Sequence, residues 1–263
     1  ITRYPSLVED NMKWLEVMAE MSGKTHAVIG FVEASKEPTG RPFYNAAALI
    51  GDGQIKGIFR KNLLPDYDEF YDIRTFEPAN EAPFLYEING VRYGFSICED
   101  IWNDASFFDH CRHKSEPIAA IMAESPDVLV NISASPTRSR KEQLKHHLLS
   151  HVASRYKTPV IYVNQVGCVD ESSFDGASRV YDETGQLIAR APAFEEHFLL
   201  VNMAQKLGSI FPLPHGLEDT FDAPKAFDPN NESDLARTYE TIVQGIQSYF
   251  QKTGFQRALL GIS

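Results

Sequence analysis

One cysteine stands where a catalytic nucleophile could work. Cys98 directly follows the apolar run 91–97 and is itself followed by Glu99 and Asp100. If that run is a strand of an α/β sheet, Cys98 lies at its carboxyl end, where ligand and catalytic sites of such sheets gather. A free cysteine is also commonly a small buried hydrophobe. Position alone therefore leaves both interpretations open.

A catalytic thiolate needs a positive group that lowers its pKa and donors that stabilise a developing oxyanion. Lys61 could be that positive group, because it ends the β-rich run 54–61, just before the long polar and aromatic segment 62–83. A lone lysine at such a place is usually a surface residue. A long irregular segment inside a domain, however, is usually functional. Lys61 and Cys98 together therefore favour covalent nucleophilic catalysis.

Three other sequence patterns give only weak indications of a functional site. Gly-Lys-Thr at 23–25 is not a phosphate loop, because Met18 stands where that motif needs glycine. His147 and His151 are one turn apart on an expected helix, but no Glu follows His147 and no third ligand is evident, so no metal site is expected. The basic stretch 138–145 could contact phosphate, although a solvated helix start is the simpler interpretation.

Composition narrows the class of protein. The chain has 263 residues, which suits one large or two small domains, and 43% hydrophobic with 23% charged residues excludes global disorder. A net charge of -11 argues against nucleic-acid or anionic-membrane partners, and no apolar run approaches a spanning length. The odd count of three cysteines, with no CxxC pair, predicts a reducing, cytoplasmic compartment.

Helical and strand patterns alternate along the chain, which predicts an α/β fold. Gly51-Asp52-Gly53, Asn89-Gly90 and Asp182-Glu183-Thr184-Gly185 are typical hairpin turns between such strands. We expect helices over 7–21, 116–124, 138–156 and 233–253, and strands over 26–33, 43–50, 54–61, 84–88, 91–97, 127–133, 159–164 and 197–202.

Two motifs around the candidate residues are specific in combination. They are Arg-Lys-Asn-Leu-Leu-Pro at 60–65 and Ile-Cys-Glu-Asp-Ile-Trp at 97–102, and segments 131–136 and 162–167 accompany them. With these motifs the chain resembles the nitrilase, or carbon-nitrogen hydrolase, superfamily over nearly its whole length. More closely it resembles the amidase domain of glutamine-dependent NAD synthetases. The resemblance implies a four-layer α-β-β-α sandwich with a Glu-Lys-Cys triad.

Carried onto this sequence, the resemblance makes Cys98 the nucleophile and Lys61 the triad lysine. The family's catalytic glutamate would lie two residues before the segment that matches 1–5, and so outside this chain. Two positions depart from the family's usual pattern: Arg3 stands where glycine is usual, and Asp72 stands where glutamate is common.

The same resemblance places Tyr67, Ser135 and Lys141 on glutamine-binding positions, with Glu99 and Phe70 lining the same pocket. Ser135 and Lys141 keep the family's six-residue separation. Without the resemblance, Tyr67 would be interpreted as a loop anchor, Ser135 as a helix cap and Lys141 as a solvated helix residue.

The function that the resemblance implies is hydrolysis of glutamine through a cysteine thioester. The ammonia would serve the ATP-dependent amidation of deamido-NAD to NAD. No cofactor is expected in this domain, whereas ATP and Mg would be bound by a synthetase domain that this chain lacks. Association into a homo-oligomer is also expected, because many members of the superfamily associate through the faces of the sandwich.

This interpretation divides the chain into three parts. They are an amidase domain over 1–210, a linker and connecting helix over 211–254, and the first strand of the absent ATP-pyrophosphatase domain over 255–263. Two alternatives stay open. The chain could be a superfamily amidase acting on another small amide, or a catalytically silent domain for oligomerisation or regulation.

Overall fold

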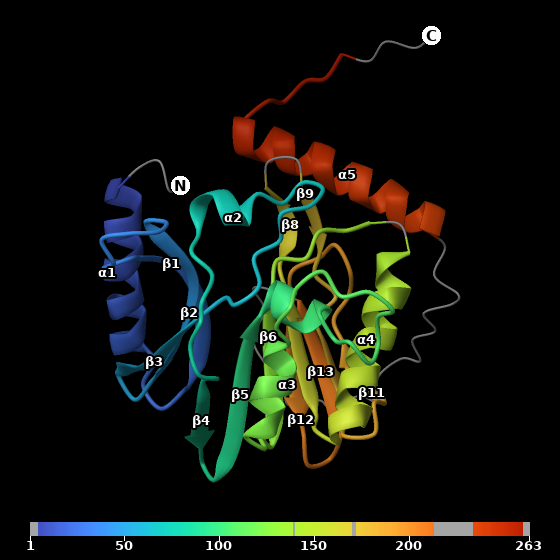
Figure 1. The fold of residues 1–263 in the computed structure, drawn as a ribbon. Helices are drawn as coiled ribbons and strands as arrows, with labels where there is room; N and C mark the ends of the chain where they lie inside the picture. The colour runs from blue at the N-terminus through green and yellow to red at the C-terminus, as the bar shows by residue number, and fades with distance from the viewer. Residues whose placement is uncertain (1–4, 139, 170–171, 213–233, 260–263) are drawn as a thin grey trace. The chain divides into compact units, whose positions relative to one another are not determined.

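The expected alternation of helices and strands is present in the computed structural model of the chain (Figure 1). The structure describes residues 5–138, 140–169, 172–212 and 234–259. The chain forms two compact units, Ile1–Ser133 and Ala134–Ser263.

The first unit begins with a helix packed on an antiparallel sheet. Helix α1 (Pro5–Met21) covers strands β1 (Ala27–Ala34), β2 (Phe43–Gly51) and β3 (Gln54–Arg60), which pair in the order β1-β2-β3. Asp52 and Gly53 both have positive φ, as the two-residue turn between β2 and β3 requires. Both the helix and this hairpin were predicted from the sequence.

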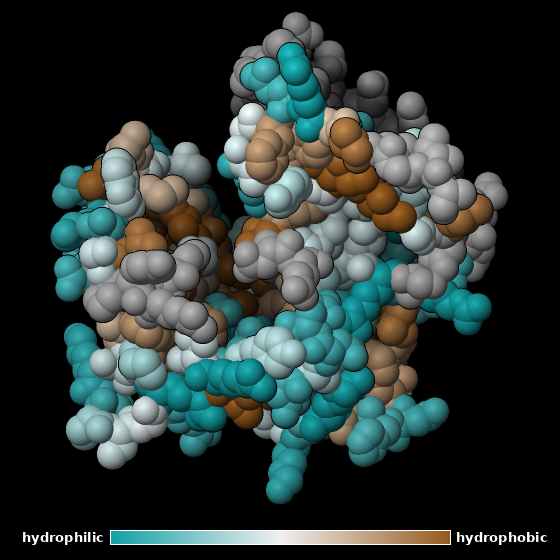
Figure 2. Space-filling view, turned by 90° about the horizontal axis from the view of Figure 1, so that it is seen from above, coloured by the Kyte–Doolittle hydropathy of each residue, from teal (hydrophilic) through white to brown (hydrophobic). Residues whose placement is uncertain are grey.

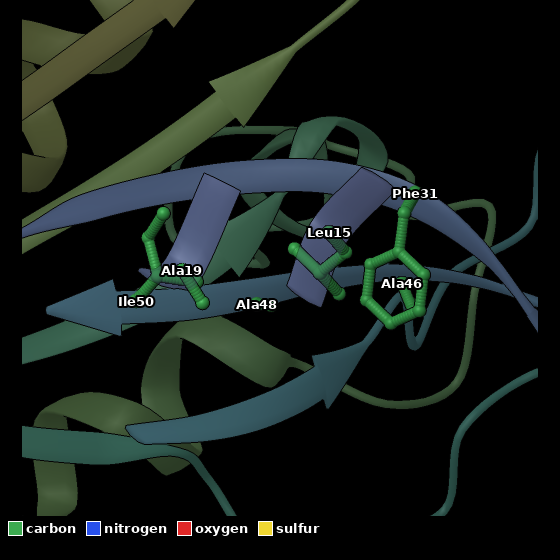
Figure 3. Packing of buried hydrophobic residues seen from close by; sticks show 6 residues of the cluster. All are labelled: Leu15, Ala19, Phe31, Ala46, Ala48 and Ile50. Carbon is green, nitrogen blue, oxygen red and sulfur yellow. The ribbon is translucent and has the colours of Figure 1, made fainter. Parts of the chain in front are cut away.

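Strand β2 separates two hydrophobic clusters, because successive side chains of a strand point to opposite faces. Ala46, Ala48 and Ile50 face α1, where they pack with Leu15, Ala19 and Phe31 (Figure 3). Ala47 and Leu49 face the other way and pack with Phe59, Phe95 and Ile97. The alanines of β2 have small side chains, which permits close approach of layers on both faces.

The second group of strands in this unit is β4 (Leu85–Ile88), β5 (Val91–Ile97) and β6 (Val128–Ser133). Strands β4 and β5 are antiparallel, and β5 and β6 are parallel. Helix α3 (Pro117–Ala123) connects β5 to β6 and packs on β5 at Gly94, where a Cβ would lie 2.5 Å from Ile121. Only glycine fits under the helix at that position.

The first unit thus contains four layers: α1, the sheet β1–β3, the strands β4–β6, and α3. Figure 1 shows α1 on the outer face of the first sheet. The predicted α-β-β-α sandwich is confirmed. It forms because successive side chains of β2, and likewise of β5, point to opposite faces, so that each strand packs against the other sheet on one face and against a helix on the other.

The second unit is built around helix α4 (Lys141–Tyr156), which packs on β7 (Val160–Asn164) and β10 (Arg179–Tyr181). Strand β11 (Leu187–Arg190) pairs with β10 across the predicted turn, where Asp182 accepts hydrogen bonds from the backbone N–H groups of Thr184 and Gln186. The remaining elements are the hairpin β8 (Val166–Val169) and β9 (Ser172–Asp175), the hairpin β12 (His197–Asn202) and β13 (Leu207–Pro212), and helix α5 (Asp234–Thr253).

Several elements differ from the sequence-based expectation. The hairpin β8–β9 and the strand β13 were not predicted, and β13 includes residues 211–212, which the prediction gave to the linker. The rest of the predicted linker, 213–233, lies outside the described residues. Residues 255–259 form no strand, because a lone strand has no partner for its backbone groups. Within the described part of the chain, no helix is long and apolar enough to cross a membrane.

Candidate active site

Cys98 occupies a strained turn directly after β5. Its φ is +46°, a conformation that costs a non-glycine residue energy and that clusters at functional sites. Residues Cys98–Trp102 form a short 3-10 turn, and the side chain of Asp100 closes it by accepting a 3.1 Å hydrogen bond from the backbone N–H of Ile97. Cys98 is buried in the cluster between the two sheets of the first unit.

Lys61 lies at the corresponding place after β3. Its backbone N–H donates to the carbonyl of Asn45 on β2, which extends the ladder by one residue. Its side chain is 4% exposed, and its Nζ donates a 2.6 Å hydrogen bond to Oδ2 of Asp72. Asp72 is the first residue of the short helix α2 (Asp72–Thr75), inside the long segment 62–83.

The electrostatics of the site keep Lys61 protonated. Burial alone would lower its pKa, but the negative charges of Cys98, Asp72 and Asp100 outweigh burial and hold the pKa above the ordinary lysine value. The structure therefore brings Lys61 and Cys98 into electrostatic contact, as their positions after two strands led us to expect.

Asp100 fixes the position of the segment that carries Lys61. Its Oδ1 accepts hydrogen bonds from the backbone N–H groups of Asn62 (3.1 Å) and Leu63 (2.9 Å). Burial raises the pKa of Asp100 to about 6, against the opposing effect of these N–H groups and of Lys61. One buried carboxylate thus ties the turn after β5 to the segment after β3.

A second group in the same unit surrounds Glu99, which is buried. The hydroxyl of Tyr67 lies 3.0 and 2.9 Å from its two carboxylate oxygens, and His113 Nε2 is 3.3 Å from Oε1. The ring of Tyr67 makes an edge contact with Phe70, at 5.4 Å between centroids, and Arg112 lies 4.0 Å over its face. Burial and the charge of Glu99 raise the pKa of Tyr67, so that it stays a hydrogen-bond donor.

The other two predicted positions belong to the second unit. Ser135 is buried, and its backbone N–H donates to Oδ1 of Asn164 at 2.9 Å. Lys141 is the half-buried first residue of α4. Ser135 does not cap that helix, whose N-cap is Arg140. Their glutamine-binding role stays a prediction.

Some residues of this site were not given a role from the sequence. Asp100 stood inside the quoted motif, and its spacing from Ile97 is typical of a side chain that caps a turn. Asp72 was noted only as a departure from the family pattern. His113 and Arg112 lie far from the motifs in the sequence, and no local pattern indicates their contact with Glu99 or Tyr67.

The histidines of α4 form no metal cluster in the described part of the chain, which contains no group of three or more potential ligands. His146 Nδ1 lies 2.9 Å from the hydroxyl of Tyr181. Burial lowers the pKa of His146, because it disfavours the charged imidazolium.

Comparison with known proteins agrees with this architecture. Residues 8–210 match the carbon-nitrogen hydrolase family, and the chain belongs to that family. It is 33% identical over 263 residues to a glutamine-dependent NAD(+) synthetase of Synechocystis sp., covering 98% of this chain and 45% of that protein. It is 29% identical to the protein of the same name from Thermotoga maritima, covering 98% of this chain and 46% of that one. The chain thus spans about half the length of these curated relatives.

Solved structures show the same fold. A glutamine-dependent NAD+ synthetase from Acinetobacter baumannii, in complex with ADP, superposes with a TM-score of 0.73 at 25% identity, over 94% of this chain and 42% of that chain. An amidase from Nesterenkonia sp. superposes with a TM-score of 0.56 at 19% identity, over 70% of this chain and 63% of that chain, a likeness of fold alone.

Proposed function

We propose that this chain is the glutaminase part of a glutamine-dependent NAD synthetase. The observation that carries the proposal is the pairing of a strained, buried cysteine with a protonated, buried lysine at the ends of β5 and β3. The relatives named above support glutamine as the substrate, because they match this chain over 98% of its length.

In the proposed reaction, the Cys98 thiolate attacks the side-chain amide carbon of glutamine. Lys61 and the backbone N–H of Glu99 stabilise the tetrahedral oxyanion, since charge stabilisation is strongest in a site shielded from water. The C–N bond then breaks, and the nitrogen leaves as ammonia after it receives a proton from the family's catalytic glutamate. The product on the enzyme is a γ-glutamyl thioester of Cys98.

Water then attacks the thioester, and the catalytic glutamate residue acts as the general base that takes the proton from this water. The free amino acid glutamate is released as product, and the thiolate of Cys98 is regenerated. That general base is expected in the parent protein, two residues before the segment that matches 1–5. Tyr67, Phe70, Glu99, Ser135 and Lys141 would bind glutamine. We assign no cofactor to this domain.

In the parent protein the ammonia would amidate deamido-NAD at the expense of ATP. Those substrates and Mg would be bound by the synthetase domain that lies outside this chain. We further propose that the parent is a cytoplasmic homo-oligomer with no membrane or nucleic-acid partner. The net charge of -11 supports the absence of nucleic-acid partners.

The proposal is tested by treating the parent protein with a diazo ketone analogue of glutamine and mapping the adduct by mass spectrometry. We expect a single adduct on Cys98 that excess glutamine blocks. Protection by another amide but not by glutamine would favour the alternative substrate class. No adduct, in a folded parent that carries the upstream glutamate, would favour a silent domain.

A substitution tests whether Cys98 is needed only for glutamine hydrolysis and not for NAD synthesis from free ammonia. Cys98→Ala is expected to abolish glutamine-driven NAD synthesis and to spare ammonia-driven synthesis, because only the first needs the thiolate. Cys111→Ala, in the same unit and half-buried, is the matched control and should leave both activities unchanged. Equal loss of both activities in Cys98→Ala would contradict the proposal.

A further inference from the structure

The segment that carries Ser135 is held by contacts from β7 and β9. Residues 134–138, which precede α4, form neither helix nor strand. The side-chain amide of Asn164, the last residue of β7, contacts both backbone groups of Ser135: its Oδ1 accepts from the N–H at 2.9 Å, and its Nδ2 donates to the carbonyl at 3.4 Å. The backbone N–H of Thr137 donates to the carbonyl of Ser173 on β9 at 2.7 Å. These contacts fix the path of a segment that has no ladder of its own.

The orientation of the Asn164 amide is fixed as well. A planar amide carries a donor and an acceptor, so it can serve the N–H and the carbonyl of Ser135 together. Both residues are buried. Nδ2 of Asn164 also donates a 3.0 Å hydrogen bond to Oδ1 of Asp175. An amide turned round would place its oxygen against this carboxylate, and Asp175 therefore decides which end of the amide meets which backbone group of Ser135.

Asp175 is itself held by cations from two helices. It is the last residue of β9 and is buried. Its Oδ1 accepts a 3.2 Å hydrogen bond from Nζ of Lys145 on α4, and its Oδ2 forms an ion pair with Arg237 on α5. A buried carboxylate is unfavourable unless it is paired, and these two cations meet that requirement. Asp175 thus links the orientation of Asn164 to the positions of α4 and α5.

Helix α5 turns polar side chains toward its own unit. Arg237 is buried, and Oε1 of Gln244 accepts a 2.6 Å hydrogen bond from the hydroxyl of Ser173. Apolar residues such as Ile242 and Ile246 are more than half exposed, and Figure 2 shows apolar surface over the helix. A helix usually buries its apolar face. Because α5 buries a guanidinium instead, its inward face is arranged around charge and hydrogen bonds.

We propose that Asn164 and Asp175 are positioning residues of the glutamine pocket, which act by holding the backbone of Ser135, with Arg237 as the outer member of the same network. The inference rests on the proposed function, in which Ser135 and Lys141 bind glutamine. Asn164 and Asp175 act through Ser135 and not on the substrate itself. A binding residue on an irregular segment keeps its position only if neighbouring contacts fix its backbone, and this chain of hydrogen bonds supplies them.

The test measures protection of Cys98 by glutamine in the full-length parent. The rate of Cys98 alkylation by iodoacetamide, followed by peptide mass spectrometry, is recorded without glutamine and at rising glutamine concentrations. We expect Asn164→Ala to raise the half-protecting glutamine concentration about tenfold, the effect of one buried hydrogen bond. Asn164→Asp should raise it further, because a carboxylate cannot donate and repels Asp175. The rate without glutamine should stay that of the wild type, since Lys61, the electrostatic partner of Cys98, belongs to the first unit.

Asn202→Ala is the matched control. Asn202 is a half-buried asparagine of the same unit, and its Oδ1 accepts a 3.0 Å hydrogen bond from the backbone N–H of Gln205. This substitution should leave glutamine protection unchanged. Arg237→Gln tests the outer member of the network. It removes one cation of Asp175 while Lys145 keeps the other, so we expect a smaller rise than in Asn164→Ala.

Wild-type protection by glutamine that is unchanged in both Asn164 variants would overturn the inference alone. A change of the same size in Asn202→Ala would also overturn it, because the effect would then be general. Unchanged protection in Arg237→Gln would remove α5 from the network. Two Asn164 variants are used so that one poorly folded protein does not decide the result. If glutamine failed to protect Cys98 in the wild type, the proposed function would be wrong and the inference would fall with it.

Discussion

The ammonium group of Lys61 donates a 2.6 Å hydrogen bond to Asp72, eleven residues further along the chain. Lys61 is buried and Asp72 is half-buried, so the contact is only partly screened by water. The carboxylate keeps the lysine charged and fixes its direction. The segment after β3 therefore supplies both the cation that the proposed reaction needs and the anion that holds this cation in place.

Asp72→Asn tests this relationship. The loss of the negative charge lowers the pKa of Lys61, and we expect kcat/KM for glutamine hydrolysis to fall about 10- to 100-fold, the equivalent of one hydrogen bond to a charged group. The alkaline limb of the pH–rate profile should move to lower pH. Asp72→Glu, which keeps the charge, should restore most of the activity. An unchanged alkaline limb in Asp72→Asn would contradict a role through Lys61.

Tyr67→Phe tests the contact with Glu99. The variant keeps the ring that packs against Phe70 but removes the donor to both carboxylate oxygens of Glu99. We expect KM for glutamine to rise about tenfold with a smaller change in kcat, because the hydroxyl orders the proposed binding pocket. Tyr71→Phe, an exposed neighbour, is the control. Equal effects of the two substitutions in steady-state assays would argue against the pocket.

Glu142→Gln tests the buried ion cluster of the second unit. Glu142 lies 2.7 Å from Arg179, 3.3 Å from Arg190 and 3.6 Å from Lys145. Burial opposes ionisation of Glu142, but these cations outweigh it and hold its pKa well below the ordinary value of 4.5. Removal of the charge takes a shared counter-ion from these buried cations, of which Lys145 keeps its ion pair with Asp175, and we expect a loss of roughly 3–5 kcal/mol of unfolding free energy at pH 7.

The pH dependence of that loss follows from the sign of the pKa shift. A carboxyl whose pKa is lowered by folding stabilises the native state above its unfolded pKa, and this contribution disappears as pH falls. The difference between wild type and Glu142→Gln should therefore shrink below about pH 4.5 in urea titrations. Glu183→Gln, which breaks an exposed pair with Lys206, is the control and should leave the midpoint unchanged. If the stability difference between wild type and Glu142→Gln did not change with pH, the lowered pKa of Glu142 would not be the source of the stabilisation.

Leu15→Ala tests the packing of α1 on the first sheet. Leu15 is buried against Phe31 and the alanines of β2 (Figure 3), so its truncation leaves a cavity. We expect thermal or urea unfolding to show a loss of about 2–5 kcal/mol. Leu7→Ala, on the exposed side of the same helix, should change stability by less than about 0.5 kcal/mol. Similar losses in the two variants would mean that α1 is not held by this face.

Local patterns were enough to predict much of the fold and part of the site. β-rich and apolar runs bounded by turn residues predicted the strands β1–β7, and helical spacing of apolar residues predicted α1. Lys61 and Cys98 were found because each directly follows a strand. The β8–β9 hairpin and β13 were missed, because the four-residue strands of that hairpin are too short for a clear period and the last two residues of β13 were assigned to a polar linker.

The sequence by itself determined the α/β class, the strand ends that carry Lys61 and Cys98, and the family resemblance, because each depends on residues close together along the chain. Only the tertiary structure decided which distant groups complete the site. Asp100 accepts a hydrogen bond from the backbone of Leu63 in the segment after β3, and His113 lies beside Glu99. It also decided that α5 turns its polar face inward. Contacts of this kind depend on how separate elements pack, and no periodicity in one segment encodes the side chains of another.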